Sequence, residues 1–136
     1  MSYADIIERL EKATGPSMDL SRDTLISTGL FVLERRGSDR KEWLYEIGKG
    51  YGREDPAFIR FNHVSKSLDA SISLVERMLP AEGFTVTRYG YPETDKPRLV
   101  FSAEMDDGIK VVKREGTLAI ALLIAMFRAL EAEAKP

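Results

Sequence analysis

Few residues in this 136-residue chain have the types and spacing needed for chemistry. His63 is the only histidine, so a Ser-His-Asp triad or a histidine base would have to use it. The chain has no GxSxG motif, and the surrounding AFIRFNHVSK has no carboxylate to orient an imidazole. We therefore expect His63 to be a surface residue or a residue at the start of a helix rather than a catalytic one. One histidine without any cysteine also fails to supply the usual nitrogen and sulfur ligands of zinc.

Three carboxylates lie close together in the sequence, at Glu104, Asp106 and Asp107. Oxygen ligands of this kind suit Mg²⁺ or Ca²⁺, which would make the chain a small divalent-metal-dependent hydrolase or a nucleotide-processing enzyme. The spacing does not match an EF-hand loop. The preferred interpretation is the solvated tip of a β-hairpin, because Asp107 and Gly108 form the strongest hairpin signal in the chain.

Two basic regions could bind an anionic ligand. Lys49 and Arg53 lie in or beside the glycine-rich GKGYG, although the phosphate-binding spacing GxxxxGK[ST] is missing. Arg88 lies beside Tyr89 and near Tyr91, an arrangement that suits phosphate contacts and base stacking. A further basic cluster consists of Arg35, Arg36, Arg40 and Lys41. A nucleic-acid-binding protein is one hypothesis, but edge strands commonly carry such charges, and we favour that interpretation.

The overall composition excludes several classes of protein. Twenty basic against 22 acidic residues give a net charge of −2, which provides no general attraction for nucleic acid or an anionic membrane. The chain has no cysteine, so disulfides and iron-sulfur sites are excluded and a reducing compartment is favoured. The acidic start MSYADIIERLEK does not resemble a secretion signal. We expect one domain over residues 1–136, a cytoplasmic location and no cofactor.

Apolar periodicity, caps and turn residues predict the elements that position these side chains. Helices are expected at residues 3–13 after the cap Ser2, from a cap at Asp19 or Ser21 to Gly29, at 68–79 after the cap Ser67, and at 117–134 with Thr117 as cap. A β-hairpin is expected at 30–36 and 41–48, and further strands at 84–92, 97–105 and 109–115. Tight turns between successive strands favour antiparallel pairing, and thus an α/β (α+β) fold with helices covering a small sheet.

The C-terminal helix is expected to be the main core element. Its apolar run from Leu118 to Phe127 is ten residues long, about half the length needed to span a bilayer. The bulky side chains cover more than half of its circumference, and a strip of small residues lies opposite, formed by Ala121, Ala125 and Ala129. This strip could pack inside the monomer, which we favour, or form the seam of a homo-oligomer.

The order of these segments resembles the phage ABA sandwich domain family, small proteins of bacteriophages and prophages. The resemblance spans nearly the whole chain and is carried by ERLEKATGP at 8–16, SLDASISLVERMLP at 67–80 and TLAIALLIAMFRALEA at 117–132. It implies a layered α/β/α sandwich and, for a phage-encoded chain, a place in the host cytoplasm. The family has no established activity, so the resemblance assigns no catalytic residues.

The leading hypothesis is therefore a phage or prophage accessory protein that is not an enzyme. It would act by binding a host protein or a small anionic ligand, with a role in countering host defence. The metal-dependent enzyme and the nucleic-acid-binding protein remain the alternatives.

Overall fold

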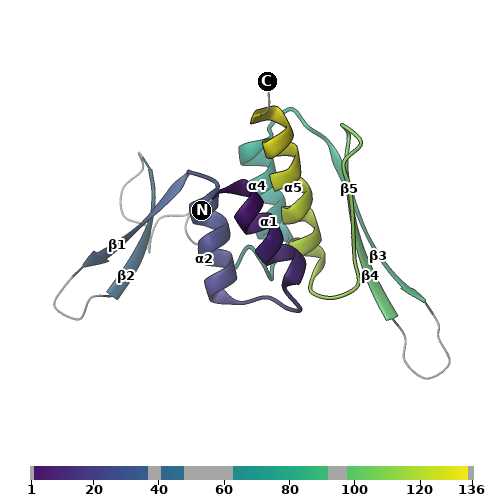
Figure 1. Ribbon diagram of the computed structural model, residues 1–136, viewed down its shortest axis with the longest axis horizontal. Coiled ribbons are helices and arrows are strands. Elements are labelled where there is room, and N and C mark those ends of the chain that lie inside the picture. The colour runs from purple at the N-terminus through teal and green to yellow at the C-terminus, as the bar shows by residue number, and fades with distance from the viewer. Residues whose placement is uncertain (1, 37–40, 48–62, 92–97, 135–136) are drawn as a thin grey trace.

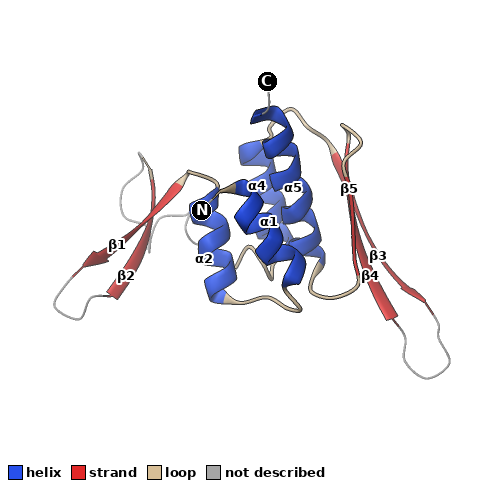
Figure 2. Ribbon diagram, in the orientation of Figure 1, coloured by secondary structure: helices blue, strands red, loops and turns tan. Residues whose placement is uncertain are grey.

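The computed structural model describes residues 2–36, 41–47, 63–91 and 98–134. Helices gather at the centre of the molecule, with a two-stranded hairpin on one side and a three-stranded sheet on the other (Figures 1 and 2). The helices are α1 (Tyr3–Lys12), α2 (Met18–Ser27), α4 (Leu68–Met78) and α5 (Leu118–Ala134). The strands are β1 (Phe31–Arg36), β2 (Lys41–Glu46), β3 (Phe84–Tyr91), β4 (Arg98–Met105) and β5 (Lys110–Lys113).

All pairing between the described strands is antiparallel. β1 pairs with β2 so that Leu33 lies opposite Leu44, and the second sheet has the order β3-β4-β5. These short connections give a small α+β fold, as the sequence predicted. Helix α5 packs on the face of the second sheet that carries Ala103 and Met105, whereas Thr87 and Glu104 on the other face are exposed. The described helices thus form a layer on this face of the sheet.

Helix α5 forms the centre of the hydrophobic core, as expected. Residues 119–127 are all buried, because α1, α4 and the sheet pack around the helix on different sides. The alanine strip Ala121, Ala125 and Ala129 is fully buried within the single chain. The strip therefore packs inside the monomer, and the alternative that it forms the seam of a homo-oligomer is wrong. None of the described helices has the length and hydrophobicity to cross a membrane.

The predicted caps are confirmed for three of the four helices that the structure describes. The hydroxyls of Ser2, Ser67 and Thr117 each accept the backbone N–H three residues later. Helix α2 is different: its cap is Ser17, whose hydroxyl accepts from the N–H of Leu20. The expected caps Asp19 and Ser21 are wrong, because both lie inside the helix.

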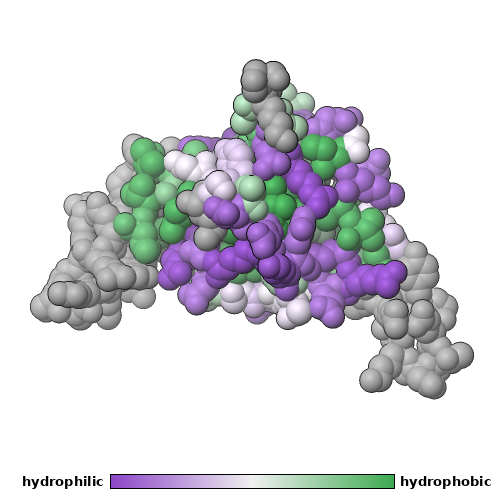
Figure 3. Space-filling model, in the orientation of Figure 1, coloured by the Kyte–Doolittle hydropathy of each residue, from purple (hydrophilic) through white to green (hydrophobic). Residues whose placement is uncertain are grey.

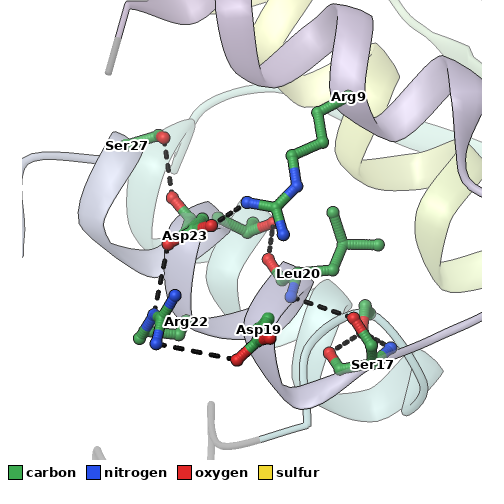
Figure 4. A network of polar contacts seen from close by, with 9 residues as sticks. Arg9, Ser17, Asp19, Leu20, Arg22, Asp23 and Ser27 are labelled. Atoms are coloured by element: carbon green, nitrogen blue, oxygen red, sulfur yellow. Dashed lines mark hydrogen bonds and ion pairs between the residues drawn. The ribbon is translucent and has the colours of Figure 1, made fainter. Parts of the chain in front are cut away.

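A network of charged side chains joins α1 to α2 (Figure 4). The guanidinium of Arg9 pairs with the carboxylate of Asp23, which also accepts from Nε of Arg22 at 3.2 Å. Arg22 extends the network to Asp19, 3.6 Å away. The Arg9–Asp23 pair connects the two helices, whereas the two pairs of Arg22 lie within α2. Each partly exposed pair contributes at most about 1 kcal/mol.

Buried hydroxyl groups join three distant parts of the chain. Oγ of Ser65, in the turn before α4, lies 2.6 Å from Oγ of Ser21 in α2 and donates to the carbonyl of Ser17 at 3.1 Å. Ser21 also accepts the N–H of Ser65. The carbonyl of Ser65 accepts from the hydroxyl of Thr117, at the start of α5, at 2.7 Å. This serine-threonine network fixes α2 and the beginning of α5 against the same turn.

Candidate functional site

The acidic turn between β4 and β5 forms a hairpin, as predicted, but its loop has three residues rather than two. The N–H of Gly108 donates to the carbonyl of Met105 at 3.0 Å, and the N–H of Met105 donates to the carbonyl of Ile109 at 2.8 Å. Gly108 has φ +98°, as expected for the left-handed residue that follows a type I turn in such a loop. Asp107 supports the turn by accepting the N–H of Ile109 at 3.0 Å.

The predicted metal ligands do not come together. Glu104 lies on the exposed face of the sheet, where Thr85 and Lys110 are its cross-strand partners. Asp106 and Asp107 line a groove elsewhere, and Glu104 is not part of its lining. Within the described ranges no three carboxylate, histidine or cysteine side chains are placed to hold a metal ion. The proposed set of Glu104, Asp106 and Asp107 is therefore wrong as an assembled site, because the strand alternation separates Glu104 from the turn.

A different set of carboxylates faces this groove. Glu82 comes from the turn after α4, Asp106 and Asp107 come from the β4–β5 turn, and Glu133 comes from the last turn of α5. We call this set the acidic groove. Burial raises the pKa of Glu82 above its ordinary value, and the negative charges of Asp107 and Glu133 add to the effect. Oε1 of Glu82 is shielded from solvent and has no hydrogen-bond partner.

The predicted anion-binding residues that the structure describes are not brought together on one face. Arg88 lies opposite Phe101 and Tyr89 lies opposite Val100, so the two side chains leave β3 on opposite faces of the sheet. One ligand on one face cannot contact both. Lys49 and Arg53 lie outside the described residues, and of Tyr91 only the backbone position, at the end of β3, is described.

The two basic regions that suggested nucleic-acid binding lie on opposite sides of the molecule. Arg35, Arg36 and Lys41 belong to the β1–β2 hairpin, whereas Arg88 belongs to β3, and the helices lie between the two sheets (Figure 1). Arg40 lies outside the described residues. The described parts of the two regions therefore do not form one continuous basic surface, because the helices separate them.

His63 begins the turn that leads to α4, and its side chain is exposed. Its carbonyl accepts the N–H groups of Lys66 and Ser67 at 2.9 and 2.8 Å. His63 does not line the acidic groove. Its position agrees with the expectation of a surface residue at the start of a helix.

An exposed apolar surface lies on the β1–β2 hairpin. The register places Leu30, Val32 and Ile47 on one face of the hairpin, which we call the outer hairpin face. Val32 is 41% exposed and Ile47 is 58% exposed, and hydrophobic residues gather on this side of the molecule (Figure 3). Positions 43 and 45 share this face in the backbone register.

The sequence analysis did not single out the outer hairpin face. The available signal was the alternation of Trp43, Tyr45 and Ile47 along β2, which marks one apolar face of a strand. That pattern does not say which face meets the core. Phe31 and Leu44, on the other face, are the residues that are buried.

Comparisons of this chain with protein-family models, with curated proteins and with solved structures find no match. The resemblance to the phage ABA sandwich domain family therefore stays a prediction.

Proposed function

We propose that this chain is a phage or prophage accessory protein that binds a host protein through the outer hairpin face. The phage origin and the host partner rest on the sequence resemblance. The binding surface rests on one structural observation: Val32 and Ile47, on one face of the hairpin, are exposed, while Leu30 beside them packs against the core.

The hairpin is anchored at its base and projects from the helices. Phe31 and Leu44 are buried and belong to the hydrophobic core, whereas Leu33, further along the same face, is exposed. Helix α2 is the helix that packs against β1. An isolated two-stranded hairpin is at best marginally stable in water, so this anchoring keeps the strands in place while their other face stays accessible.

The clustering of apolar residues distinguishes this surface from other exposed residues. Single exposed hydrophobic side chains are common on proteins and need no explanation. Val112, at 56% exposure, is such a case, since it lies on β5 on the other side of the helices. Val32 and Ile47 instead lie on the same face of one hairpin, and clustered exposed apolar residues on a monomer mark an interaction site.

Substitutions to threonine, which is polar and β-branched, test the proposal. The double variant Val32→Thr with Ile47→Thr keeps β-branched residues in the hairpin but places hydroxyl groups on the outer hairpin face. Val112→Thr is the matched control, because the same change is made at a similarly exposed strand position. The wild-type chain is immobilised, proteins are captured from a bacterial lysate and identified by mass spectrometry, and the affinity of each purified partner is then measured for all three forms.

We expect at least about tenfold weaker binding for the double variant, equal to about 1.4 kcal/mol, and unchanged binding for Val112→Thr. Circular dichroism and thermal melting should show the same fold for all three forms. Equal affinity of the double variant and the wild type would refute the outer hairpin face as the contact surface. A partner lost equally in Val112→Thr would show that the effect is not local.

A further inference from the structure

The acidic groove has an unfavourable arrangement of charge. Its described lining consists of four carboxyl groups and the residues Met78, Leu79, Pro80 and Ala81. None of these lining residues is basic. Glu133 makes the arrangement of charge more unfavourable, because it lies in the last turn of α5, where the helix dipole is negative and cations are favoured. No basic residue lies in that last turn. A local conflict of this kind is expected at a functional or strained site.

The two turns that form the groove are held together closely. The N–H of Asp106 donates to the carbonyl of Gly83 at 3.0 Å. A Cβ added to Gly83 would lie 2.3 Å from Oδ2 of Asp106, so a larger residue here would require the Asp106 side chain to move. The approach brings Glu82, the neighbour of Gly83, against Asp107.

We propose that the acidic groove opens and closes with pH. With a proton on Glu82, shared with Asp107, the turn after α4 stays on the β4–β5 turn. When that proton leaves for solvent, the carboxylates of Glu82, Asp107 and Glu133 repel one another and the hydrogen bond from Asp106 to Gly83 weakens.

The geometry and the charges support this coupling. Oε1 of Glu82 is shielded from solvent without a partner, which disfavours the ionised form. Burial first, and then the charge of Asp107, raises the pKa of Glu82, while a hydrogen bond from the Asp107 N–H opposes the shift. The other titratable groups that face Glu82 in the described part of the chain are Asp106 and Glu133, and both are acidic.

The sign of the pH dependence follows from linkage. Below the ordinary pKa of a glutamate, Glu82 is protonated in the closed and the open form alike, so it does not oppose closure. As the pH rises through the raised pKa of the closed form, ionisation is more favourable in the open form. The population of the open form then increases by up to about tenfold for each unit by which the two pKa values differ.

Hydrogen exchange at one amide measures the opening directly. The protection factor of the Asp106 N–H is followed by NMR from pH 4 to pH 7.5, with correction for the intrinsic pH dependence of exchange. We expect protection to fall as the pH rises in the wild type, and to stay high across the range in Glu82→Gln. Asp107→Asn should also keep protection high, because asparagine preserves the acceptor for Ile109 and removes the charge.

Glu76→Gln is the matched control, because Glu76 is an exposed glutamate of α4 that does not line the groove. This variant should keep the wild-type pH dependence. A flat profile in the wild type, or an unchanged profile in Glu82→Gln, overturns the proposal. A profile made flat by millimolar Mg²⁺ or Ca²⁺, with saturation, also overturns it, because the carboxylates would then be a cation site rather than a pH-dependent contact.

Discussion

Removal of the Ser65 hydroxyl tests whether the serine-threonine network holds the helices together. Ser65 is fully buried, and its Oγ contacts Oγ of Ser21 at 2.6 Å and the carbonyl of Ser17 at 3.1 Å, and accepts the N–H of Ser17 at 3.3 Å. In Ser65→Ala, the buried hydroxyl of Ser21 keeps the N–H of Ser65 as a donor but loses its hydroxyl partner. A buried polar group left without a partner costs about 1–3 kcal/mol. We therefore expect the free energy of unfolding to fall by about 2 kcal/mol.

Ser71→Ala is the matched control, because Ser71 is also a fully buried serine. Its hydroxyl donates only to the carbonyl of Leu68 within α4, and that carbonyl keeps its place in the helical hydrogen-bond ladder. Both variants remove one oxygen atom, so the cavity contribution is the same. The higher helix propensity of alanine also offsets the lost bond, and we expect a change of at most about 0.5 kcal/mol.

Urea denaturation followed by far-UV circular dichroism measures both variants. With a denaturant dependence of about 1.5 kcal/mol per molar urea, a loss of about 2 kcal/mol lowers the midpoint of Ser65→Ala by about 1.3 M. The midpoint of Ser71→Ala should move by about 0.3 M or less. Equal shifts for the two variants would refute the reasoning, because the contacts between α2 and the turn at Ser65 would then add nothing beyond an ordinary buried hydroxyl.

Three further substitutions test separate parts of the fold, each by its free energy of unfolding in urea. Leu122→Ala, at a fully buried position of α5, should cost about 3–5 kcal/mol, whereas Val112→Ala, at an exposed position, should change stability by about 0.5 kcal/mol or less. Gly108→Ala should cost about 1–2 kcal/mol through its φ of +98° alone, since open space surrounds an added Cβ; an unchanged stability would mean that the turn has rearranged. Thr117→Val removes the cap of α5 and the donor to Ser65, and should cost about 2 kcal/mol; a cost below about 0.5 kcal/mol would contradict both roles.

Signals that act within a few residues predicted the secondary structure well. The caps Ser2, Ser67 and Thr117 are confirmed, because a hydroxyl that bonds the N–H three residues later depends only on local chain geometry. The cap of α2 was misplaced because three residues of types that cap helices, Ser17, Asp19 and Ser21, lie within five positions. The choice of Ser17 is fixed partly from outside the helix, by contacts with Ser65, 48 residues away.

The candidate sites depended on how distant segments meet, which the sequence does not state. Glu104 and Asp106 are two residues apart, yet strand alternation places Glu104 on the exposed sheet face while Asp106 turns toward the groove. Glu82 and Glu133 reach the same groove from 24 residues before and 27 residues after Asp106, and no local pattern predicts that meeting.

The β1–β2 hairpin also shows that the sequence does not state which segments meet. Both faces of β1 and β2 carry large apolar residues, so the sequence predicts two strands but does not determine which face meets the helices. In the folded chain α2 packs against β1, Phe31 and Leu44 are buried in the core, and Val32 and Ile47 stay in solvent. Exposed apolar residues such as these lower the solubility of a protein unless they bind a partner. A binding role for this hairpin is therefore the function to test first.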